Sequence, residues 1–302
     1  MTKIALIVPC LNEAEALPVL FEQISKHLPE ANVHIFDNGS TDTTVEIAHN
    51  YGAVVHSVLE RGKGRVVSRM FSDVEADVYM MVDGDATYDL SHAKEHIDLI
   101  IGRQIDMLVG SRMSTYKTSS SRKGHKAGNI VLSLLLNKLF DGRLNDVLSG
   151  YRIMSRRFVK SAPIMADGFE IEVMLTIHAL DLRCHVVEMP IQYLKRIDGT
   201  VSKLNTVRDG WTILMAIIYF FKEIAPFRFF TIVSVFLTSI SLLVGIPVVI
   251  EFFDTGLVPR FPSAILAASL MLAALISFSC GLILSSVAAQ RRELKRLFFL
   301  HQ

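Results

Sequence analysis

Cysteine is scarce in this sequence: Cys10, Cys184 and Cys280 lie far apart and match no metal-binding spacing. We therefore expect free thiols in a reducing compartment rather than a disulfide framework. The formal net charge is only +1, which argues against a nucleic-acid binder that depends on a broad basic field. The N-terminal apolar run, residues 4–8, is too short for a secretory signal peptide, so the first domain is predicted to stay in the cytosol.

Apolar residues are plentiful, and they are unevenly placed. They make up 51% of the 302 residues, and the excess gathers after Pro226. Residues 229–250 and 263–289 contain no charged side chain. As a helix the first run would be about 33 Å long, enough to cross the hydrocarbon core. We predict a hairpin of two transmembrane helices over residues 229–289, because a charge-free pair of this length is hard to bury in a small soluble protein.

Charged residues around the two runs predict their orientation. The outer flanks are basic and the short connection is mixed: the flanks carry Lys222, Arg228, Arg291, Arg292, Lys295 and Arg296, and the connection carries Glu251, Asp254 and Arg260. The positive-inside rule then places both ends of the hairpin in the cytosol. Residues 206–228 are predicted to form a juxtamembrane interfacial helix, with a helix packed on the globular domain as the alternative. Residues 290–302 are predicted to be a basic cytosolic tail.

Residues 1–205 are predicted to form one α/β domain. Short apolar runs alternate with helical patterns from residue 4 to residue 110, which indicates a mainly parallel sheet covered by helices on both faces. Pro9, Asp37, Asp83 and Arg112 fall at the ends of predicted strands. Ligands on such sheets bind beyond the carboxyl ends of the strands, so these positions predict a ligand site. No G-x-G-x-x-G follows the first strand, which argues against a dinucleotide-binding dehydrogenase.

Asp83 and Asp85 stand one residue apart, directly after the apolar run 78–82. Two such carboxylates can converge on one divalent cation, and hard oxygen ligands suit Mg2+ or Mn2+. The same ion can take diphosphate oxygens and neutralise the charge of a departing nucleoside diphosphate. An acidic turn without such a role is the alternative for this motif alone, and the strand before it and Asp89 after it favour the metal.

A basic segment follows the last of these strands, with Arg112, Arg122, Lys123, His125 and Lys126 close together. Arginine forks bind phosphate oxygens through two hydrogen bonds. A solvated loop, or one that touches anionic lipid headgroups, is the alternative. The place of Arg112 directly after an apolar strand favours a phosphate substrate.

The motifs occur in one order along residues 4–204: Ile7-Val8-Pro9 to Asn12-Glu13, Asp37 to Asp42, Asp83-Gly84-Asp85, Gly110-Ser111-Arg112, Ser149-Gly150-Tyr151-Arg152, and Arg196 to Lys203-Leu204. With this set the chain resembles the inverting family 2 glycosyltransferases, which have the Rossmann-like GT-A fold. It is most similar to the polyprenyl-phosphate glycosyltransferases, the group of dolichyl-phosphate mannose synthase and the bacterial undecaprenyl-phosphate sugar transferases.

The resemblance implies roles for the matching residues. Asp83 and Asp85 would hold the metal, and Asp85, Arg112 and Arg122 would be the catalytic residues. The residues that would bind the nucleotide-sugar are Pro9, Leu11, Asn12, Glu13, Asp37, Asn38, Asp83, Gly84, Arg196 and Lys203. The residues that would face the lipid phosphate are Arg112, Arg122, Lys126 and Ser149.

Three positions depart from the mannose synthases. Asn38 replaces an acid, Thr87 replaces a metal-associated glutamine, and Glu170 replaces a basic residue. These differences argue against a guanine nucleotide and mannose, and they favour a UDP-sugar as the donor.

The implied reaction transfers a single sugar, with inversion, from the nucleotide-sugar to a polyprenyl phosphate. Because the acceptor phosphate is already anionic, positioning and charge neutralisation are sufficient and no general base is needed. The resemblance implies a multi-pass protein of the inner membrane, with the catalytic domain and C-terminus in the cytosol. Its partners would be the two substrates and membrane lipid, without nucleic acid, and a homo-oligomer stays open.

Two other functions are alternatives. A processive polysaccharide synthase would carry a Q-x-x-R-W element, but the single tryptophan lies in Asp209-Gly210-Trp211. A non-catalytic membrane adaptor or a translocator subunit is the second. Spans without an intramembrane charge offer no polar path for a sugar headgroup, and the intact acidic pair argues against a catalytically dead domain.

Overall fold

The computed structural model describes residues 2–113, 123–164, 166–197 and 206–301. The chain divides into two compact units, Met1–Ile217 with Lys295–Gln302, and Ile218–Leu294. The first contains the predicted α/β domain, and the second contains most of the apolar sequence.

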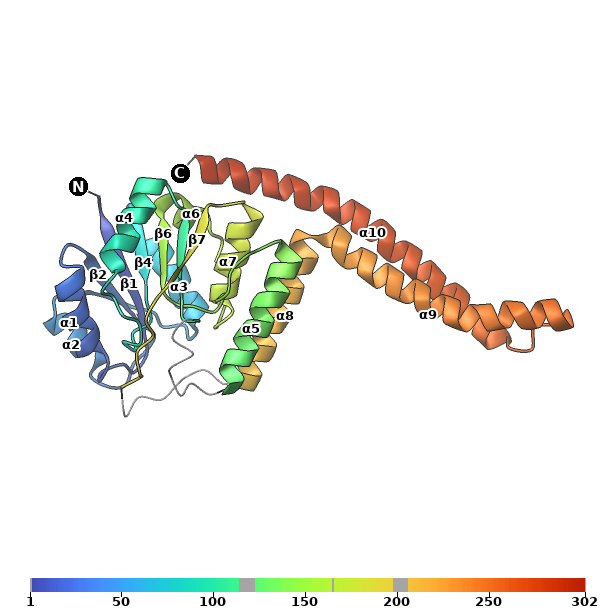
Figure 1. Ribbon diagram of the computed structural model, residues 1–302, viewed down its shortest axis with the longest axis horizontal. Coiled ribbons are helices and arrows are strands. Elements are labelled where there is room, and N and C mark those ends of the chain that lie inside the picture. Colours follow the sequence, from blue (N-terminus) through green and yellow to red (C-terminus); the bar gives the residue numbers. More distant parts are fainter. Residues whose placement is uncertain (1, 114–122, 165, 198–205, 302) are drawn as a thin grey trace. The chain divides into compact units, whose positions relative to one another are not determined.

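A seven-stranded sheet forms the centre of the first unit (Figure 1). In chain order its strands are β1 (Ile4–Cys10), β2 (Asn32–Asp37), β3 (Val54–Ser57), β4 (Val78–Met81), β5 (Met107–Ser111), β6 (Arg152–Ser155) and β7 (Val186–Pro190), and their spatial order is β3-β2-β1-β4-β6-β5-β7. All neighbouring pairs are parallel except those of β6, which runs antiparallel to both β4 and β5. The mainly parallel sheet predicted from the sequence is confirmed.

The strand β6 was not predicted, because its four residues give no clear period and begin with an arginine. Its antiparallel course brings the preceding loop, residues 146–151, to the carboxyl end of β4. That loop is therefore placed beside the acidic turn by the topology of the sheet.

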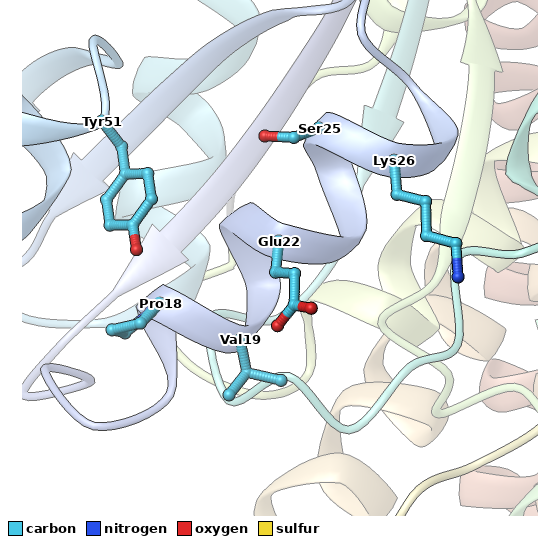
Figure 2. Close-up of a pocket in the computed structure, with 6 residues that line it drawn as sticks. All are labelled: Pro18, Val19, Glu22, Ser25, Lys26 and Tyr51. Atoms are coloured by element: carbon cyan, nitrogen blue, oxygen red, sulfur yellow. The ribbon is translucent and has the colours of Figure 1, made fainter.

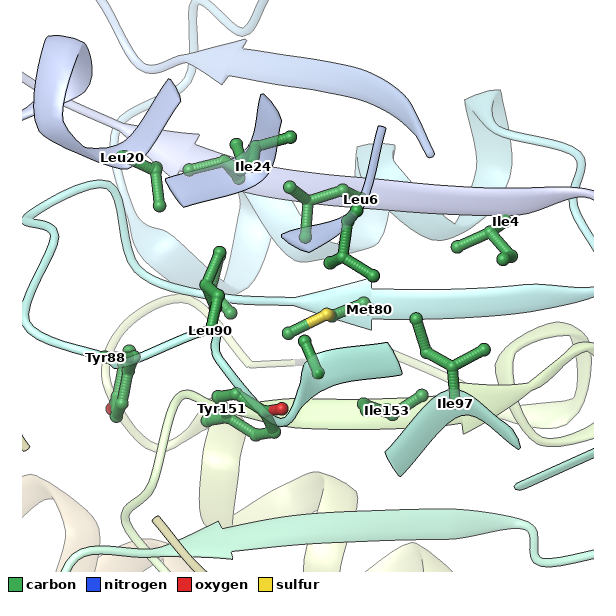
Figure 3. Close-up of a cluster of buried hydrophobic side chains, with 14 of the residues drawn as sticks. Ile4, Leu6, Leu20, Ile24, Met80, Tyr88, Leu90, Ile97, Tyr151 and Ile153 are labelled. Carbon is green, nitrogen blue, oxygen red and sulfur yellow. The ribbon is translucent and has the colours of Figure 1, made fainter. Parts of the chain in front are cut away.

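Helices pack on both faces of the sheet. The helices along this part of the chain are α1 (Leu17–His27), α2 (Thr44–Asn50), α3 (Lys63–Asp73), α4 (Ala93–Arg103), α5 (Lys123–Phe140), α6 (Arg156–Ser161), α7 (Ile171–Asp181) and α8 (Thr206–Ile224). Of these, α5 packs against α7 instead of the sheet, and α8 continues into the second unit. Figure 3 shows Leu20 and Ile24 of α1 and Ile97 of α4 directed at the face of the sheet that carries Leu6 and Met80. Burying one such aliphatic side chain stabilises the fold by about 1.5–3 kcal/mol, so this cluster fixes the strands that end at the site.

The second unit is a helical hairpin of α9 (Pro226–Thr255) and α10 (Phe261–Leu300), the end of which belongs to the first unit. Both helices are long and apolar enough to cross a membrane, with mean hydropathies of 2.4 and 2.2. Only 11% and 17% of their most apolar windows are buried, which is unlike the core helix of a soluble protein. The two helices that could span a membrane therefore agree with the prediction.

Small polar residues join the two hairpin helices. The hydroxyls of Ser234 and Ser241 on α9 each donate to a backbone carbonyl of α10, those of Ala274 and Ala267, at 2.8 Å. A Cβ on Gly281 would lie 2.9 Å from Cβ of Phe230, so this position requires a glycine for the observed approach. Close contact at small residues is how helices pack in a membrane, where no hydrophobic force drives them together.

The last turns of α10 pack on the α/β unit. Lys295 lies 3.1 Å from the buried carboxylate of Asp181 on α7, and the guanidinium of Arg157 lies 5.1 Å from the ring centroid of Phe299. Residues 290–300, predicted to be a tail, thus continue α10 as a helix.

Candidate active site

The acidic turn that follows β4 lies against the end of β1. A Cβ on Gly84 would be 2.8 Å from the sulfur of Cys10 and 3.3 Å from the carbonyl oxygen of Pro9. Only glycine allows so close an approach between the turn and β1. Asp83 and the predicted nucleotide residues are therefore brought together at one edge of the sheet, as the strand ends predicted.

Asp83 is surrounded by groups that fix its carboxylate. Lys63 Nζ lies 2.5 Å from Oδ1, and the hydroxyl of Tyr88 donates to Oδ2 at 3.4 Å. Burial by itself raises the pKa of the Asp83 carboxyl, but attraction to Lys63 and its hydrogen bond outweigh burial and hold the pKa below its usual value. Asp83 is therefore ionised at neutral pH.

Lys63 also binds a second carboxylate, that of Glu172 on α7, at 2.5 Å. Burial lowers the pKa of Lys63, but the two carboxylates raise it above the usual value for lysine. Lys63 and Glu172 were not among the predicted site residues. The only local signal was the pair of glycines that flank Lys63, since a Cβ on either Gly62 or Gly64 would lie 2.1 Å from a backbone carbonyl of residues 166–167.

Asp85 is buried and is paired with Arg196, which reaches it from the segment after β7. Its Oδ1 accepts hydrogen bonds from the hydroxyl of Thr87 at 2.6 Å and from the Thr87 backbone N–H at 3.2 Å. Thr87 therefore orients the second carboxylate of the pair. Arg196, which was predicted to bind the nucleotide-sugar, therefore lies beside the acidic pair.

The predicted nucleotide residues at the ends of β1 and β2 are joined by hydrogen bonds. The side-chain oxygen of Asn12 accepts from the Thr41 N–H at 2.7 Å, and the Asn12 N–H donates to the Ser40 hydroxyl at 2.8 Å. The Asp37 carboxylate accepts from Gly39 and Ser40 N–H groups at 3.1 Å. These contacts build a two-loop surface that also carries Pro9, Leu11 and the buried Glu13.

The Asn38 side chain forms hydrogen bonds with the backbone of residues 58–62. Its amide donates to the carbonyls of Val58 and Glu60 at 3.0 and 2.7 Å, and its oxygen accepts from the Gly62 N–H at 2.9 Å. The side chain predicted to bind the nucleotide thus shapes residues 58–62. An asparagine suits this position because its amide supplies both a donor and an acceptor. An ionised carboxylate could only accept hydrogen bonds.

Arg112 is held by a buried carboxylate. Its Nε and Nη2 lie 2.8 and 2.7 Å from the two oxygens of Asp146, which has no exposed side-chain surface. Asn129 on α5 also donates to Asp146, at 2.8 Å. Burial raises the pKa of Asp146, but Arg112 holds it below its usual value. The arginine predicted to face a lipid phosphate is therefore oriented by Asp146, a partner that the sequence analysis missed.

The structure gives less information about the other residues that were predicted to bind the substrates. Ser149 is fully buried and its hydroxyl accepts from the Tyr151 N–H at 3.3 Å, so it lies inside its loop. Lys126 lies half-buried on α5. Arg122 and Lys203 lie outside the described residues, and their predicted roles remain predictions.

A buried arginine shapes the loop before β6. Arg152 is fully buried and donates to the carbonyls of Val147 and Ser149 at 2.9 and 3.1 Å, and to the hydroxyl of Thr176 at 3.0 Å. Burial lowers its pKa to about 10, which still leaves it charged at neutral pH. The arginine of the Ser149-Gly150-Tyr151-Arg152 motif is therefore a structural cation.

Eight of the described side chains around Asp83 are four cations and four carboxylates, and the buried Glu13 lies beside the same turn. The cations are Lys63, Arg112, Arg152 and Arg196, and the anions are Asp83, Asp85, Asp146 and Glu172. All four carboxylates already have a cationic partner. Among these eight groups no net positive charge is left over for an incoming diphosphate.

The acidic pair has the chemistry that a divalent ion requires. Asp83 and Asp85 supply hard carboxylate oxygens, and each already attracts a cation. In the described part of the chain no group of three or more His, Cys, Asp or Glu side chains is placed to hold a metal. The protein would thus contribute two carboxylates, with diphosphate and water as the other ligands, which is the usual arrangement for Mg2+.

Gly150 leaves the space that the Asp83 carboxylate occupies. A Cβ on Gly150 would lie 2.4 Å from Asp83 Oδ2, so Gly150→Ala must displace the carboxylate. A misplacement of this size can lower kcat/KM by about 10²-fold. Gly102→Ala is the matched control, because a Cβ there meets nothing within 4 Å. Steady-state kinetics of both variants test the prediction, and equal activities would contradict it.

A surface hollow lies elsewhere on the α/β unit. Figure 2 shows it on the outer side of α1, lined by Pro18, Val19, Glu22, Ser25, Lys26 and Tyr51. Its charged groups are one carboxylate and one ammonium, which give no net charge to attract a diphosphate. It contains none of the eight ionisable groups around Asp83.

Comparison with known proteins identifies the family of this chain. Residues 5–161 match the model of the family described as glycosyl transferase family 2. An uncharacterized protein of Shigella flexneri is 49% identical over 156 residues, which are 52% of this chain and 96% of the relative. An undecaprenyl-phosphate mannosyltransferase of Micrococcus luteus is 27% identical over 221 residues, which are 67% of this chain and 88% of that protein.

Solved structures agree on the fold. The glucosyl-3-phosphoglycerate synthase of Mycobacterium tuberculosis, in complex with Mn2+, UDP and its product, superposes with a TM-score of 0.58 at 22% identity. The match covers 72% of this chain and 80% of that structure. Family match, fold and acidic pair together show that this chain is a glycosyltransferase and belongs to glycosyl transferase family 2.

Proposed function

We propose that this enzyme transfers a single sugar from a nucleotide-sugar to a polyprenyl phosphate at the cytosolic face of the membrane, with inversion and with a divalent metal ion. The observation that supports this proposal best is the acidic pair Asp83 and Asp85, which lies among paired cations at the carboxyl end of the sheet. The chain that carries this site also contains two helices that could span a membrane.

The need for a metal follows from the charge of the site. A nucleoside diphosphate brings negative charge to a cluster in which every carboxylate is already paired with a cation. Asp83 and Asp85 would hold Mg2+ or Mn2+, and the ion would supply positive charge at the leaving diphosphate. Arg196, beside Asp85, is placed to bind diphosphate oxygens as well.

The donor is proposed to be a UDP-sugar. Asn38, Thr87 and Glu170 are the positions at which the chain departs from the mannose synthases. Asn38 is engaged with the backbone of residues 58–62, and Asp37, Glu13 and Asp42 supply carboxylates to the two-loop surface. Carboxylates of this kind can accept hydrogen bonds from a ribose or a base.

The acceptor is proposed to bind at Arg112. Asp146 fixes this guanidinium through Nε and Nη2, so its orientation is set before any substrate arrives. Arg122 and Lys126, on the chain just beyond, would add positive charge for the lipid phosphate. The phosphate oxygen is already a nucleophile at neutral pH, so the protein needs to orient it and no side chain must remove a proton.

Exposed apolar side chains support an active site at a lipid surface. On α8, Trp211 is 63% exposed, and on α5 Val131 and Leu134 are 63% and 64% exposed. Large apolar groups that face solvent in this way are typical of helices that lie in a membrane interface. Basic residues beside the spans favour the cytosolic side for the catalytic unit.

A screen of nucleotide-sugars against undecaprenyl phosphate tests this function. The full-length protein is incubated with each donor in lipid nanodiscs, and the lipid product is identified by mass. We expect one sugar per lipid with one class of donor, loss of product in EDTA, and no product from undecaprenol without phosphate. A polymeric product would instead indicate a processive synthase, and failure to bind any nucleotide-sugar by calorimetry would indicate a non-catalytic subunit.

A further inference from the structure

Tyr88 lies where the acidic turn meets the loop before β6. The residue is only 2% exposed. Its hydroxyl accepts a hydrogen bond from the Gly150 N–H at 2.9 Å and donates one to Asp83 Oδ2 at 3.4 Å. Figure 3 shows its ring beside that of Tyr151, with the two centroids 6.0 Å apart. One hydroxyl thus links the Asp83 carboxylate to the backbone of residues 146–151.

Tyr88 is also attached to the segment that carries Arg196. Tyr88 and Tyr193 form an antiparallel β-bridge, and their rings meet edge to face with centroids 5.6 Å apart. The Leu194 N–H donates to the Thr87 carbonyl at 2.8 Å. The guanidinium of Arg112 lies 5.6 Å from the centroid of the Tyr193 ring. Tyr88 therefore contacts both the loop before β6 and the segment that carries Arg196.

The hydroxyl of Tyr88 lies between a hydrogen-bond donor, the Gly150 N–H, and a hydrogen-bond acceptor, the Asp83 carboxylate. Its oxygen accepts the hydrogen bond from the Gly150 N–H, and its proton is donated to the Asp83 carboxylate. The Asp83 carboxylate is then held with Oδ2 at Tyr88 and Oδ1 at Lys63.

We propose that Tyr88 is a positioning residue for the metal-bound donor, whose hydroxyl fixes the Asp83 carboxylate so that Asp83 and Asp85 can bind one divalent ion together. This inference rests on the proposed function, since it requires the acidic pair to bind the metal. It assigns to Tyr88 a role through Asp83, without contact between Tyr88 and the substrates.

The test is the affinity of the full-length protein for Mn2+ in the presence of UDP. Free Mn2+ is measured by electron paramagnetic resonance for the wild type and for Tyr88→Phe. Loss of one hydrogen bond to a charged group should weaken Mn2+ binding about ten-fold. Tyr151→Phe is the matched control, because it removes an equally buried hydroxyl whose partner is His96 Nδ1 at 2.9 Å.

Metal affinity and thermal stability together separate the outcomes. We expect both variants to lower the Tm by similar small amounts, with weaker Mn2+ binding for Tyr88→Phe alone. Equal Mn2+ affinity of Tyr88→Phe and the wild type would overturn the positioning role, as would equal weakening in both variants. A wild type that binds no Mn2+ with UDP would instead overturn the proposed metal site, and the positioning role with it.

Discussion

Asp85→Asn is expected to lower kcat/KM by about 10³-fold, since it removes charge at the point where the leaving diphosphate must be neutralised. Asparagine keeps the size of the side chain and can still accept the hydrogen bond of the Thr87 hydroxyl, which lies 2.6 Å from Oδ1. It loses the negative charge that attracts Arg196 and that a divalent cation would need. Steady-state kinetics with the donor found in the nucleotide-sugar screen measure the effect.

A carboxylate far from the acidic turn provides the control for Asp85. Asp98 is exposed on α4, and Asp98→Asn makes the same chemical change there. Such a surface change usually alters stability by less than about 0.5 kcal/mol, so activity should stay near that of the wild type. Chelation of the metal should reproduce the loss seen with Asp85→Asn. Full activity of that variant, or of the wild type in EDTA, would exclude the proposed metal mechanism.

Lys63→Met is expected to destabilise the protein by about 3–5 kcal/mol and to reduce activity strongly, because it leaves the buried Glu172 and the partly buried Asp83 without their shared cation. Lys63 lies 2.5 Å from both Asp83 and Glu172, and its side chain is 13% exposed. A loss of this size corresponds to a fall in Tm of roughly 10 °C. Thermal unfolding of the full-length protein measures it.

An exposed ion pair provides the control for Lys63. Lys94 lies 3.5 Å from Glu30, and the two side chains are 64% and 43% exposed. Lys94→Met should cost no more than about 1 kcal/mol, since solvent screens such pairs. In a second variant, Glu172→Leu combined with Lys63→Met should restore part of the stability without restoring activity. Equal Tm values for Lys63→Met and Lys94→Met would show that the buried cluster does not stabilise the fold.

Much of the fold could be predicted from local patterns. The short apolar runs between residues 4 and 110 predicted the strands that the structure shows as β1 to β5, and the charge-free runs predicted the two long apolar helices. Each of these signals is contained in about 5–25 consecutive residues. The strand β6 was not predicted, because its four residues begin with a buried arginine and show no such pattern.

The site was predicted in part. The spacing of Asp83 and Asp85 and the position of Arg112 after an apolar strand predicted that they lie at one end of the sheet, and the structure brings them together there. Local sequence gave no sign that Arg112 is paired with Asp146, 34 residues away, or that the Asn38 amide is used by residues 58–62. Lys63 and Glu172, 109 residues apart, were missed for the same reason.

The sequence by itself determined the alternation of strands and helices up to residue 110, the spacing of the acidic pair and the presence of an apolar hairpin, because periodicity and charge-free length act over short distances along the chain. The tertiary structure alone decided which cation each carboxylate meets, how Tyr88 joins Asp83 to Gly150, and why Gly150 has no side chain. Those choices depend on the antiparallel course of β6 and on helices packed across the sheet, which bring together groups that no local pattern relates.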